Sequence, residues 1–262
     1  MQFTKLITLA LLGALNIENV QAATYSQLSS VRKVLESDKT FSEDIFKQIL
    51  ARNDLNHLLL SDVQVLVMQL MEEFPEFIKV RSIGKSWFDR KILMFEIDAR
   101  DHILSQRKGG EDTKELLKEK PAILLTGAHH AREVMSVQLP LYAMLKMLHG
   151  YVHNDKHYVD LLLQNKYYVI PVVNVDGLGW IEEEWTKNKV LKNKRKNMNP
   201  TLNKFNLCDD FANTGVDLNR NYAVDWHKPG GNSPDPCAES YRGTAPFSEP
   251  ETRAIRDFLI SH

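Results

Sequence analysis

The stretch PAILLTG, residues 121–127, runs without a break into AHHAREVMS, residues 128–136. A short apolar run of this kind is typical of a strand that is buried on both faces. An apolar helix is predicted directly after it, from Val137 to Leu148, with Pro140 near its first turn, where proline is tolerated. Because open α/β sheets place their ligands at the carboxyl ends of strands, the polar residues between strand and helix mark a candidate site.

Three further strands are predicted on both sides of this stretch. FIKVRSIG (77–84) and KILMFEID (91–98) are expected to pair through a turn, and YYVIPVVNV (167–175) is expected to be a second buried strand that ends at Asp176-Gly177. Residues 107–120 form a polar segment that predicts an exposed loop.

Helical spacing of apolar residues predicts three further helices. One carries Ile45, Phe46, Ile49 and Leu50; the second begins at the capping-box pattern of Ser61 and Gln64 and stops at Pro75; the last follows a capping box at Ser248–Glu251 and aligns Ile255, Phe258 and Leu259. Strands that alternate with helices predict an α/β fold with a central mixed, largely parallel β-sheet and helices on both faces.

The composition is that of an ordinary globular protein, with 43% hydrophobic and 26% charged residues in a chain of 262. The net charge of −1 argues against a general polyanion binder. The basic run Lys187–Lys196 does not change this conclusion, because the acidic cluster Glu182–Glu184 lies beside it. Nucleic acid is therefore not expected as a partner.

The first 22 residues predict a secretory signal peptide that is cut after Ala22. They contain Lys5, an apolar core from Leu6 to Leu15 and the small-x-small pattern Val20-Gln21-Ala22. The alternative is a membrane anchor, but the apolar run is too short to span a bilayer comfortably. We therefore expect a secreted protein without a membrane span, in which the two cysteines, Cys208 and Cys237, form a disulfide rather than two buried thiols.

His130 and Glu133 lie three residues apart and could direct an imidazole and a carboxylate at one cation such as Zn²⁺. This pair alone is weak support for a metal site. The alternative is a histidine bonded to a backbone carbonyl and a glutamate at a helix N-terminus.

Further motifs, taken in their order along the chain, strengthen the metal interpretation. They are IGKSWFDRKI (83–92), HARE (130–133), NVDG (174–177), KRKN (194–197) and GVDLNRNY (215–222). Together they resemble the zinc carboxypeptidases of the carboxypeptidase A type, whose motifs include H-x-R-E, N-P-D-G and D-x-N-R-N. One departure is valine in place of proline at position 175. The resemblance extends from about Leu58 to His262.

The resemblance implies a zinc-exopeptidase-like fold and a Zn²⁺ cofactor, with His130 and Glu133 as two of three protein ligands. Such a metal lowers the pKa of bound water and makes it a nucleophile. Arg195 aligns with the family's arginine that stabilises the negative charge on the scissile carbonyl oxygen. The alternative for Arg195 is a solvated charge within the basic run.

The resemblance also implies a partner: a peptide or protein with a free C-terminal carboxylate. Asn219 and Arg220 match the clamp that binds this carboxylate, and Arg132 matches a further substrate-contacting arginine; a planar guanidinium suits the bidentate contact. A salt bridge to Asp217 is the alternative for Arg220. We expect His129 to face away from His130, Asp176 to form a turn, and the Cys208–Cys237 disulfide to bracket the clamp.

The family's third zinc ligand, general-base glutamate and last strands and helices are expected beyond position 262. His262 is expected to be a frayed terminus rather than a substitute ligand. The predicted organisation is a signal peptide at 1–22, a helical leader or short propeptide at 23–58, and the N-terminal portion of a catalytic domain at 59–262. Two ligands without a third predict little activity for these residues alone, so the alternative function is an inactive relative that binds peptide C-termini without turnover. The codons that follow His262 would distinguish an active carboxypeptidase from this inactive relative.

Overall fold

The computed structural model describes residues 30–38, 40–41, 45–49, 55, 57–106, 119–203, 208, 211–228 and 230–262. The predicted signal peptide, Leu50 and most of the polar loop at 107–120 lie outside these residues. The chain divides into two compact units, which we describe separately. Unit 1 comprises 1–81, 94–125 and 139–170, and unit 2 comprises 82–93, 126–138 and 171–262.

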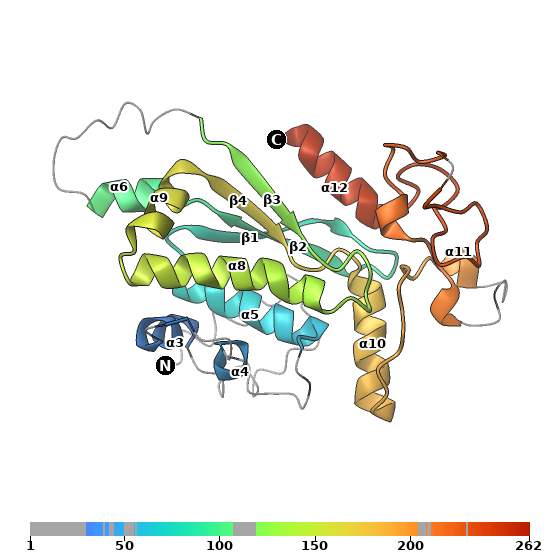
Figure 1. Cartoon of the computed structure of the whole chain (residues 1–262), viewed down its shortest axis with the longest axis horizontal. Coiled ribbons are helices and arrows are strands. Elements are labelled where there is room, and N and C mark those ends of the chain that lie inside the picture. Colours follow the sequence, from blue (N-terminus) through green and yellow to red (C-terminus); the bar gives the residue numbers. More distant parts are fainter. Residues whose placement is uncertain are drawn as a thin grey trace. The chain divides into compact units, whose positions relative to one another are not determined.

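Four strands form one sheet in the order β1-β2-β4-β3: β1 (Ile78–Lys85), β2 (Lys91–Ile97), β4 (Lys166–Ile170) and β3 (Ala122–Thr126) (Figure 1). β2 pairs antiparallel with β4, with Phe95 opposite Val169. β3 and β4 run parallel, because the bonds from Lys166 N to Pro121 O and from Val173 N to Gly127 O advance together along both segments. The predicted mixed sheet is confirmed, and its parallel pairing joins β3 to β4.

The prediction that PAILLTG is buried on both faces is wrong. Ala122 and Thr126 are exposed, and Ile123 retains 39% of its accessible surface. The physical reason is the position of β3 at the edge of the described sheet, where it has a neighbour on one side only (Figure 1). β4 lies between β2 and β3, and its residues from Tyr167 to Ile170 are buried as predicted.

β4 ends at Ile170 rather than at Val175, because Pro171 has no N–H to contribute to the sheet. Val173 and Asn174 still donate backbone hydrogen bonds to Gly127 and Ala128. Helix α10 (Val175–Asn188) then begins, with the side chain of Asn174 as its cap. Asp176 therefore lies in the first turn of a helix, and the predicted strand-ending turn is not formed there.

Unit 1 contains most of the helices at the start of the chain. They are α3 (Val31–Ser37), α4 (Ile45–Ile49), α5 (Leu60–Glu73), α6 (Arg100–Gln106), α9 (Lys156–Gln164) and all but the first turn of α8 (Met135–Val152). α3 contacts both α4 and α5, and α6 contacts α9. None of the described helices is long and apolar enough to cross a membrane.

Two helix starts in this region differ from the prediction. α5 begins at Leu60, and the carboxylate of Asp62, rather than a box of Ser61 and Gln64, accepts a hydrogen bond from Leu59 N at 3.0 Å. α8 begins at Met135, two residues earlier than predicted, which puts Pro140 in its second turn.

Unit 2 contains α10, α11 (Pro200–Asn203), the 3-10 turns η1 (Phe211–Asn213) and η2 (Leu218–Arg220), and α12 (Pro250–Ser261). The N-cap of α12 is Glu249 and not the predicted Ser248, whose hydroxyl donates instead to the Glu249 carboxylate. Ile255 and Phe258 are buried, whereas Leu259 is 56% exposed, so the apolar face of α12 is narrower than predicted.

Candidate functional site

The turn at 128–134, which carries His130 and Glu133, is held by backbone hydrogen bonds to the segment Lys194–Asn197. Arg132 N donates to Lys194 O at 2.7 Å and Ala131 N donates to Arg195 O at 3.3 Å. The amide of Asn174 donates to the carbonyl oxygens of His129 and Arg195, and so joins both segments to the start of α10. Gly177 is required beside it, because a Cβ there would lie 2.7 Å from the Asn174 side chain and 2.9 Å from Ala131. These contacts bring three of the quoted motifs together.

The imidazole of His130 lies between two carboxylates. Its Nδ1 is 2.9 Å from Glu133 Oε1, and its Nε2 is 2.8 Å from Asp217 Oδ1. His130 and Asp217 are buried, whereas half of the Glu133 side chain is exposed. The side chains of His130 and Glu133, which the sequence predicts to act together, therefore point toward each other, with the Glu133 carboxylate on the solvent side.

This geometry restricts where protons can lie on His130. A hydrogen bond from Nε2–H to Asp217 leaves a lone pair on Nδ1 in the neutral ring. A lone pair on Nδ1 and a carboxylate oxygen 2.9 Å away repel each other unless a proton or a cation lies between them. The arrangement therefore suits a cation bound jointly by Nδ1 and Oε1.

Arg195 completes the cluster and is not a solvated charge. Its Nη1 donates to Glu133 Oε1 at 3.1 Å, while its Nε and Nη2 donate to Asp217 Oδ2 at 3.1 and 2.9 Å. Only 15% of the side chain is exposed. The imidazole, the carboxylate and the guanidinium assigned to the chemistry thus meet around Asp217.

Asp217 is the residue of this cluster that sequence reasoning missed, since it was considered only as a partner for Arg220. It is fully buried, and its Oδ1 also accepts from Asn219 N at 3.0 Å, so that it caps η2. Burial raises its pKa, but the hydrogen bonds and charges of His130 and Arg195 outweigh that effect and lower the pKa overall. An aspartate two residues before an asparagine predicts a local cap; nothing in that spacing predicts the distant imidazole.

Arg132 lies on the same turn but engages a different partner. Its Nη1 donates to Glu239 Oε1 at 2.8 Å and to Asn193 Oδ1 at 3.2 Å. The hydrogen bond to Glu239 raises the pKa of Arg132, although slight burial opposes it. The structure therefore places Arg132 in an exposed ion pair.

Asn219 and Arg220 lie in η2, and Asn219 is exposed. The Arg220 guanidinium donates to the carbonyl oxygens of Gly231 and, at 3.1 Å, Asn219. Among the described residues, no carboxylate lies within ion-pair distance of it, and the alternative pairing with Asp217 is not formed. Both residues line a hollow of about 390 Å³, together with Tyr222, Val224, Asp225, Trp226, Lys228, Gly230, Gly231 and Asn232.

Three other polar residues have structural partners. His129 faces away from the cluster as expected, with Nε2 2.8 Å from the Tyr222 hydroxyl; burial and the neighbouring His130 lower its pKa to about 4. Asp176 accepts from Ser86 Oγ, Phe88 N and Arg90 Nη1, which ties the β1–β2 turn to α10. His262 caps the last turn of α12 through a contact with Phe258 O.

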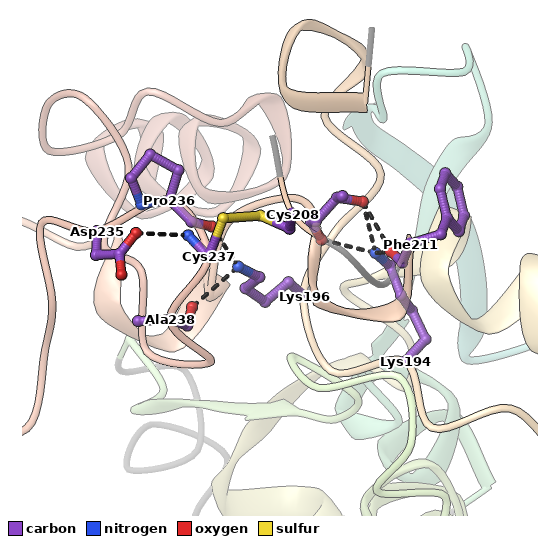
Figure 2. The surroundings of a disulfide bond; sticks show 9 residues. Lys194, Lys196, Cys208, Phe211, Asp235, Pro236, Cys237 and Ala238 are labelled. Carbon is purple, nitrogen blue, oxygen red and sulfur yellow. Dashed lines mark hydrogen bonds between the residues drawn. A yellow bond between two sulfur atoms is a disulfide. The ribbon is translucent and has the colours of Figure 1, made fainter. Parts of the chain in front are cut away.

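The predicted disulfide is present. Cys208 and Cys237 are bonded, with their Cα atoms 5.4 Å apart, and enclose the segment that carries Asp217, Asn219 and Arg220 (Figure 2). Beside the disulfide lie two lysine side chains, Lys194 and Lys196, which donate to carbonyl oxygens of the two linked loops (Figure 2).

The donor atoms of His130 and Glu133 fit two positions of a zinc site. They are of the nitrogen and oxygen types that Zn²⁺ prefers, and Asp217 supplies the carboxylate partner that ligating histidines commonly have on the other ring nitrogen. Within the described part of the chain, no group of three or more histidine, cysteine, aspartate or glutamate side chains could hold a metal ion. A catalytic zinc needs one protein ligand more than this pair.

Comparison with known proteins places this cluster in a family. The family model described as zinc carboxypeptidase matches residues 63–262. The chain belongs to the zinc carboxypeptidase family. The match includes every residue of the cluster and both cysteines.

Individual carboxypeptidases support this assignment. Mast cell carboxypeptidase A of Homo sapiens is 32% identical over 195 residues, and carboxypeptidase B of Astacus astacus is 28% identical over 193 residues; each alignment covers 74% of this chain. The chain spans 39% of the length of the first relative and 53% of the second.

Solved structures agree on the fold. A crystal structure of thrombin activatable fibrinolysis inhibitor matches 88% of this chain with a TM-score of 0.61 at 25% identity, over 49% of that chain. Carboxypeptidase A from Helicoverpa armigera has the same fold, with a TM-score of 0.59 over 88% of this chain and 48% of its own. The α/β fold with an open mixed sheet is thus the carboxypeptidase fold.

Proposed function

We propose that this protein is a secreted zinc metallocarboxypeptidase that hydrolyses the C-terminal peptide bond of peptides and proteins. The observation that carries the proposal is the meeting of His130, Glu133 and Arg195 through contacts of 2.9 and 3.1 Å. A metal-ligand pair beside a guanidinium supports peptide hydrolysis, because a metal-bound water and a cation for the carbonyl oxygen are needed at neighbouring positions.

In this proposal His130 and Glu133 would hold Zn²⁺, which would supply an activated water as the nucleophile. Asp217 accepts a hydrogen bond from Nε2–H of His130, which would leave the Nδ1 lone pair free to bind the metal. Arg195, oriented by the same carboxylate, donates to the scissile carbonyl oxygen as negative charge develops there. One buried aspartate therefore orients both a metal ligand and the group that stabilises the developing charge.

The substrate's terminal carboxylate is assigned to Arg220 and Asn219. Arg132 and Arg195 both have carboxylate partners, whereas the described residues provide only carbonyl oxygens for Arg220. Carbonyl oxygens do not neutralise the charge of a guanidinium. Arg220 can therefore bind a carboxylate bidentately, and this binding is favourable. Arg132, whose pair with Glu239 is exposed, is assigned a further contact to the substrate.

The rest of the proposal follows from the family resemblance. Residues 1–22 are assigned to a signal peptide, 23–58 to a leader or short propeptide, and 59–262 to a zinc carboxypeptidase catalytic domain. The disulfide supports the assignment to a secretory compartment, because disulfides persist in oxidising surroundings.

The test uses the protein as it is encoded, purified with zinc and assayed with a blocked dipeptide that has a free C-terminal carboxylate. We expect hydrolysis that a chelator abolishes, and binding of the dipeptide about tenfold or more tighter than that of its C-terminal amide. Arg220→Lys should remove most of this preference. The matched control is Arg256→Lys on α12, an arginine paired with its neighbour Asp257. Equal binding of acid and amide would refute the clamp, and binding of the acid without hydrolysis would favour a non-catalytic binding protein.

A further inference from the structure

In the segment Lys194–Asn197, the side chain of Arg195 and those of its two lysine neighbours extend to different partners. Arg195 extends to Glu133 and Asp217, whereas Lys194 and Lys196 extend to the two loops that the disulfide joins (Figure 2). Both lysines are buried, with 0% and 1% of their surface exposed. Burial of an ammonium group is costly unless strong hydrogen bonds compensate it.

The ammonium of Lys196 makes two such bonds, to Pro236 O at 2.7 Å and to Ala238 O at 2.9 Å. It also lies 5.8 Å from the centre of the Tyr241 ring. Burial lowers the pKa of Lys196 to about 8, so the group is an ammonium at neutral pH. Its two acceptors flank Cys237, and the bonds therefore fix the turn on both sides of the disulfide (Figure 2).

The turn spans 236–239 and ends at Glu239, whose carboxylate bonds both terminal nitrogens of Arg132. Ala238, which bonds Lys196, and Glu239, which bonds Arg132, are neighbours in the chain. Lys196 is therefore connected to Arg132 through two adjacent residues. Arg132 is also connected directly to the segment that carries Lys196, because Arg132 N donates to Lys194 O and Ala131 N donates to Arg195 O. The contacts therefore form a closed set. Lys196 bonds the turn at 236–239, Glu239 of that turn bonds Arg132, and the backbone of Arg132 bonds the segment that carries Lys196.

We propose that Lys196 is a positioning residue: its buried ammonium fixes the turn at 236–239, so that Glu239 holds Arg132 in place beside His130 and Glu133. Hydrogen bonds to a charged group are about twice as strong as neutral ones. Through its two hydrogen bonds, the lysine therefore joins the disulfide-linked loop to the segment that carries Arg195. Only the consequence for peptide binding rests on the proposed function.

The first test is amide hydrogen exchange, which needs no substrate. Lys196→Met keeps the apolar stem and removes the ammonium. We expect the amides of 237–241 to exchange about tenfold faster or more relative to those of α12, and the amides of Ala131 and Arg132 to follow. Lys192→Met is the control, because Lys192 belongs to the same basic run but is exposed beside Glu184. Unchanged exchange at 237–241, or an equal increase throughout α12, would overturn the proposal.

Glu239→Gln is the second variant, and it covers the case in which Lys196→Met does not fold, because more than half of the Glu239 side chain is exposed. The proposal expects it to leave exchange at 237–241 unchanged, since Lys196 still holds the turn. Faster exchange there would show that the Glu239–Arg132 pair holds the turn, and would overturn the role of Lys196. Lys196→Arg, which keeps a charged donor, should restore slow exchange.

The link to the site is tested with the same free-carboxylate dipeptide. Lys196→Met and Glu239→Gln should weaken its binding by similar factors, and the double variant should be no weaker than the weaker single one. If the double variant instead weakens binding by the product of the two single factors, the two residues act independently, which would contradict the proposal. If the wild-type protein binds acid and amide equally, the proposed function fails, whereas the exchange experiment still decides the role of Lys196.

Discussion

Single buried charges organise this site. Asp217 and Lys196 are almost inaccessible to solvent. Asp217 bonds side chains from two separate segments of the chain, and Lys196 bonds two carbonyl oxygens of one distant turn. Asp217 orients His130 and Arg195, while Lys196 connects the disulfide-linked turn to the segment Lys194–Asn197 beside them. Removal of one partner from such a buried set leaves the others without compensation, so these positions should be far less tolerant than exposed charges.

Asp217→Asn is expected to lower the free energy of unfolding by about 3 kcal/mol, because Arg195 and His130 lose a buried anionic partner. The affinity for Zn²⁺ should fall about 10- to 100-fold, since the imidazole is no longer oriented by a carboxylate. Urea denaturation and competition with a chelating dye measure the two effects. Asp225→Asn, an exposed change beside Lys228, should alter stability by less than about 0.5 kcal/mol. Similar values for both variants would contradict the proposed role.

The buried carboxyl group of Glu251 is expected to make the free energy of unfolding depend on pH. It is buried, one carboxylate oxygen is near Asn197, and the other has no hydrogen-bond partner among the described residues. Burial, together with the charges of Glu249 and Asp176, raises its pKa to about 8. The folded state therefore holds a proton that the unfolded state releases at a lower pH, and this contribution is lost as pH rises from the unfolded value towards about 8.

We expect the free energy of unfolding to decrease by up to about 4 kcal/mol between about pH 5 and pH 8, because each of these three units of pH contributes about 1.4 kcal/mol at most. Glu251→Gln is uncharged at every pH and can still accept from Asn197. It should remove this slope and be the more stable protein at about pH 8. Urea denaturation at several pH values tests this, and an unchanged slope in the variant would show that another group is responsible.

The secondary-structure elements were predicted more reliably than their surroundings. The β1–β2 pair, β4, α5, α8 and α12 lie where the apolar patterns indicate, but local signals misplaced the caps of α5 and α12, and β3 proved to be exposed. Apolar content shows that a segment can be a strand, whereas its place in the sheet decides how much of it is covered. Sheet order depends on pairings between distant segments, which the sequence pattern does not encode locally.

Close packing of two elements within unit 2 leads to a prediction about Gly84. A Cβ at this position of β1 would lie 2.6 Å from the Cβ of Ala254 in α12. Gly84→Ala should therefore lower the free energy of unfolding by about 1–3 kcal/mol through overpacking. Combination with Ala254→Gly should recover part of the loss, after allowance of about 1 kcal/mol for glycine in a helix. Strictly additive effects in urea denaturation would mean that the two residues are not in contact.

At the scale of the whole molecule, the family match extends from residue 63 to residue 262 and crosses both compact units. The cluster, the clamp and the disulfide all lie within unit 2. In that unit much of the backbone lies outside regular helices and strands, so side-chain contacts and the covalent link contribute more to its order. The disulfide is the covalent one of these constraints, and it encloses the clamp.

Replacement of both Cys208 and Cys237 by serine should lower the free energy of unfolding by about 3–4 kcal/mol, because the 29-residue separation no longer restricts the unfolded chain. Thermal and urea unfolding in the presence and absence of a reductant measure this. Reductant should destabilise the wild-type protein and leave the double serine variant unaffected. A loss below about 0.5 kcal/mol would show that the lysine contacts alone hold the two loops.

Residue patterns alone were enough to indicate the family, the main strands and helices, the disulfide and the residues His130, Glu133, Arg195 and Arg220. These follow from local periodicity and from short motifs whose residue types are set by their chemistry. The tertiary structure alone decided that Asp217 joins His130 to Arg195 and that Lys194 and Lys196 are buried within a basic run. It also decided that Arg132 pairs with Glu239, whereas the partners of Arg220 among the described residues are carbonyl oxygens. The physical reason is that burial and pairing of a charge depend on atoms contributed by segments 20 to 107 residues away, such as Thr214 for Lys194 and Glu239 for Arg132.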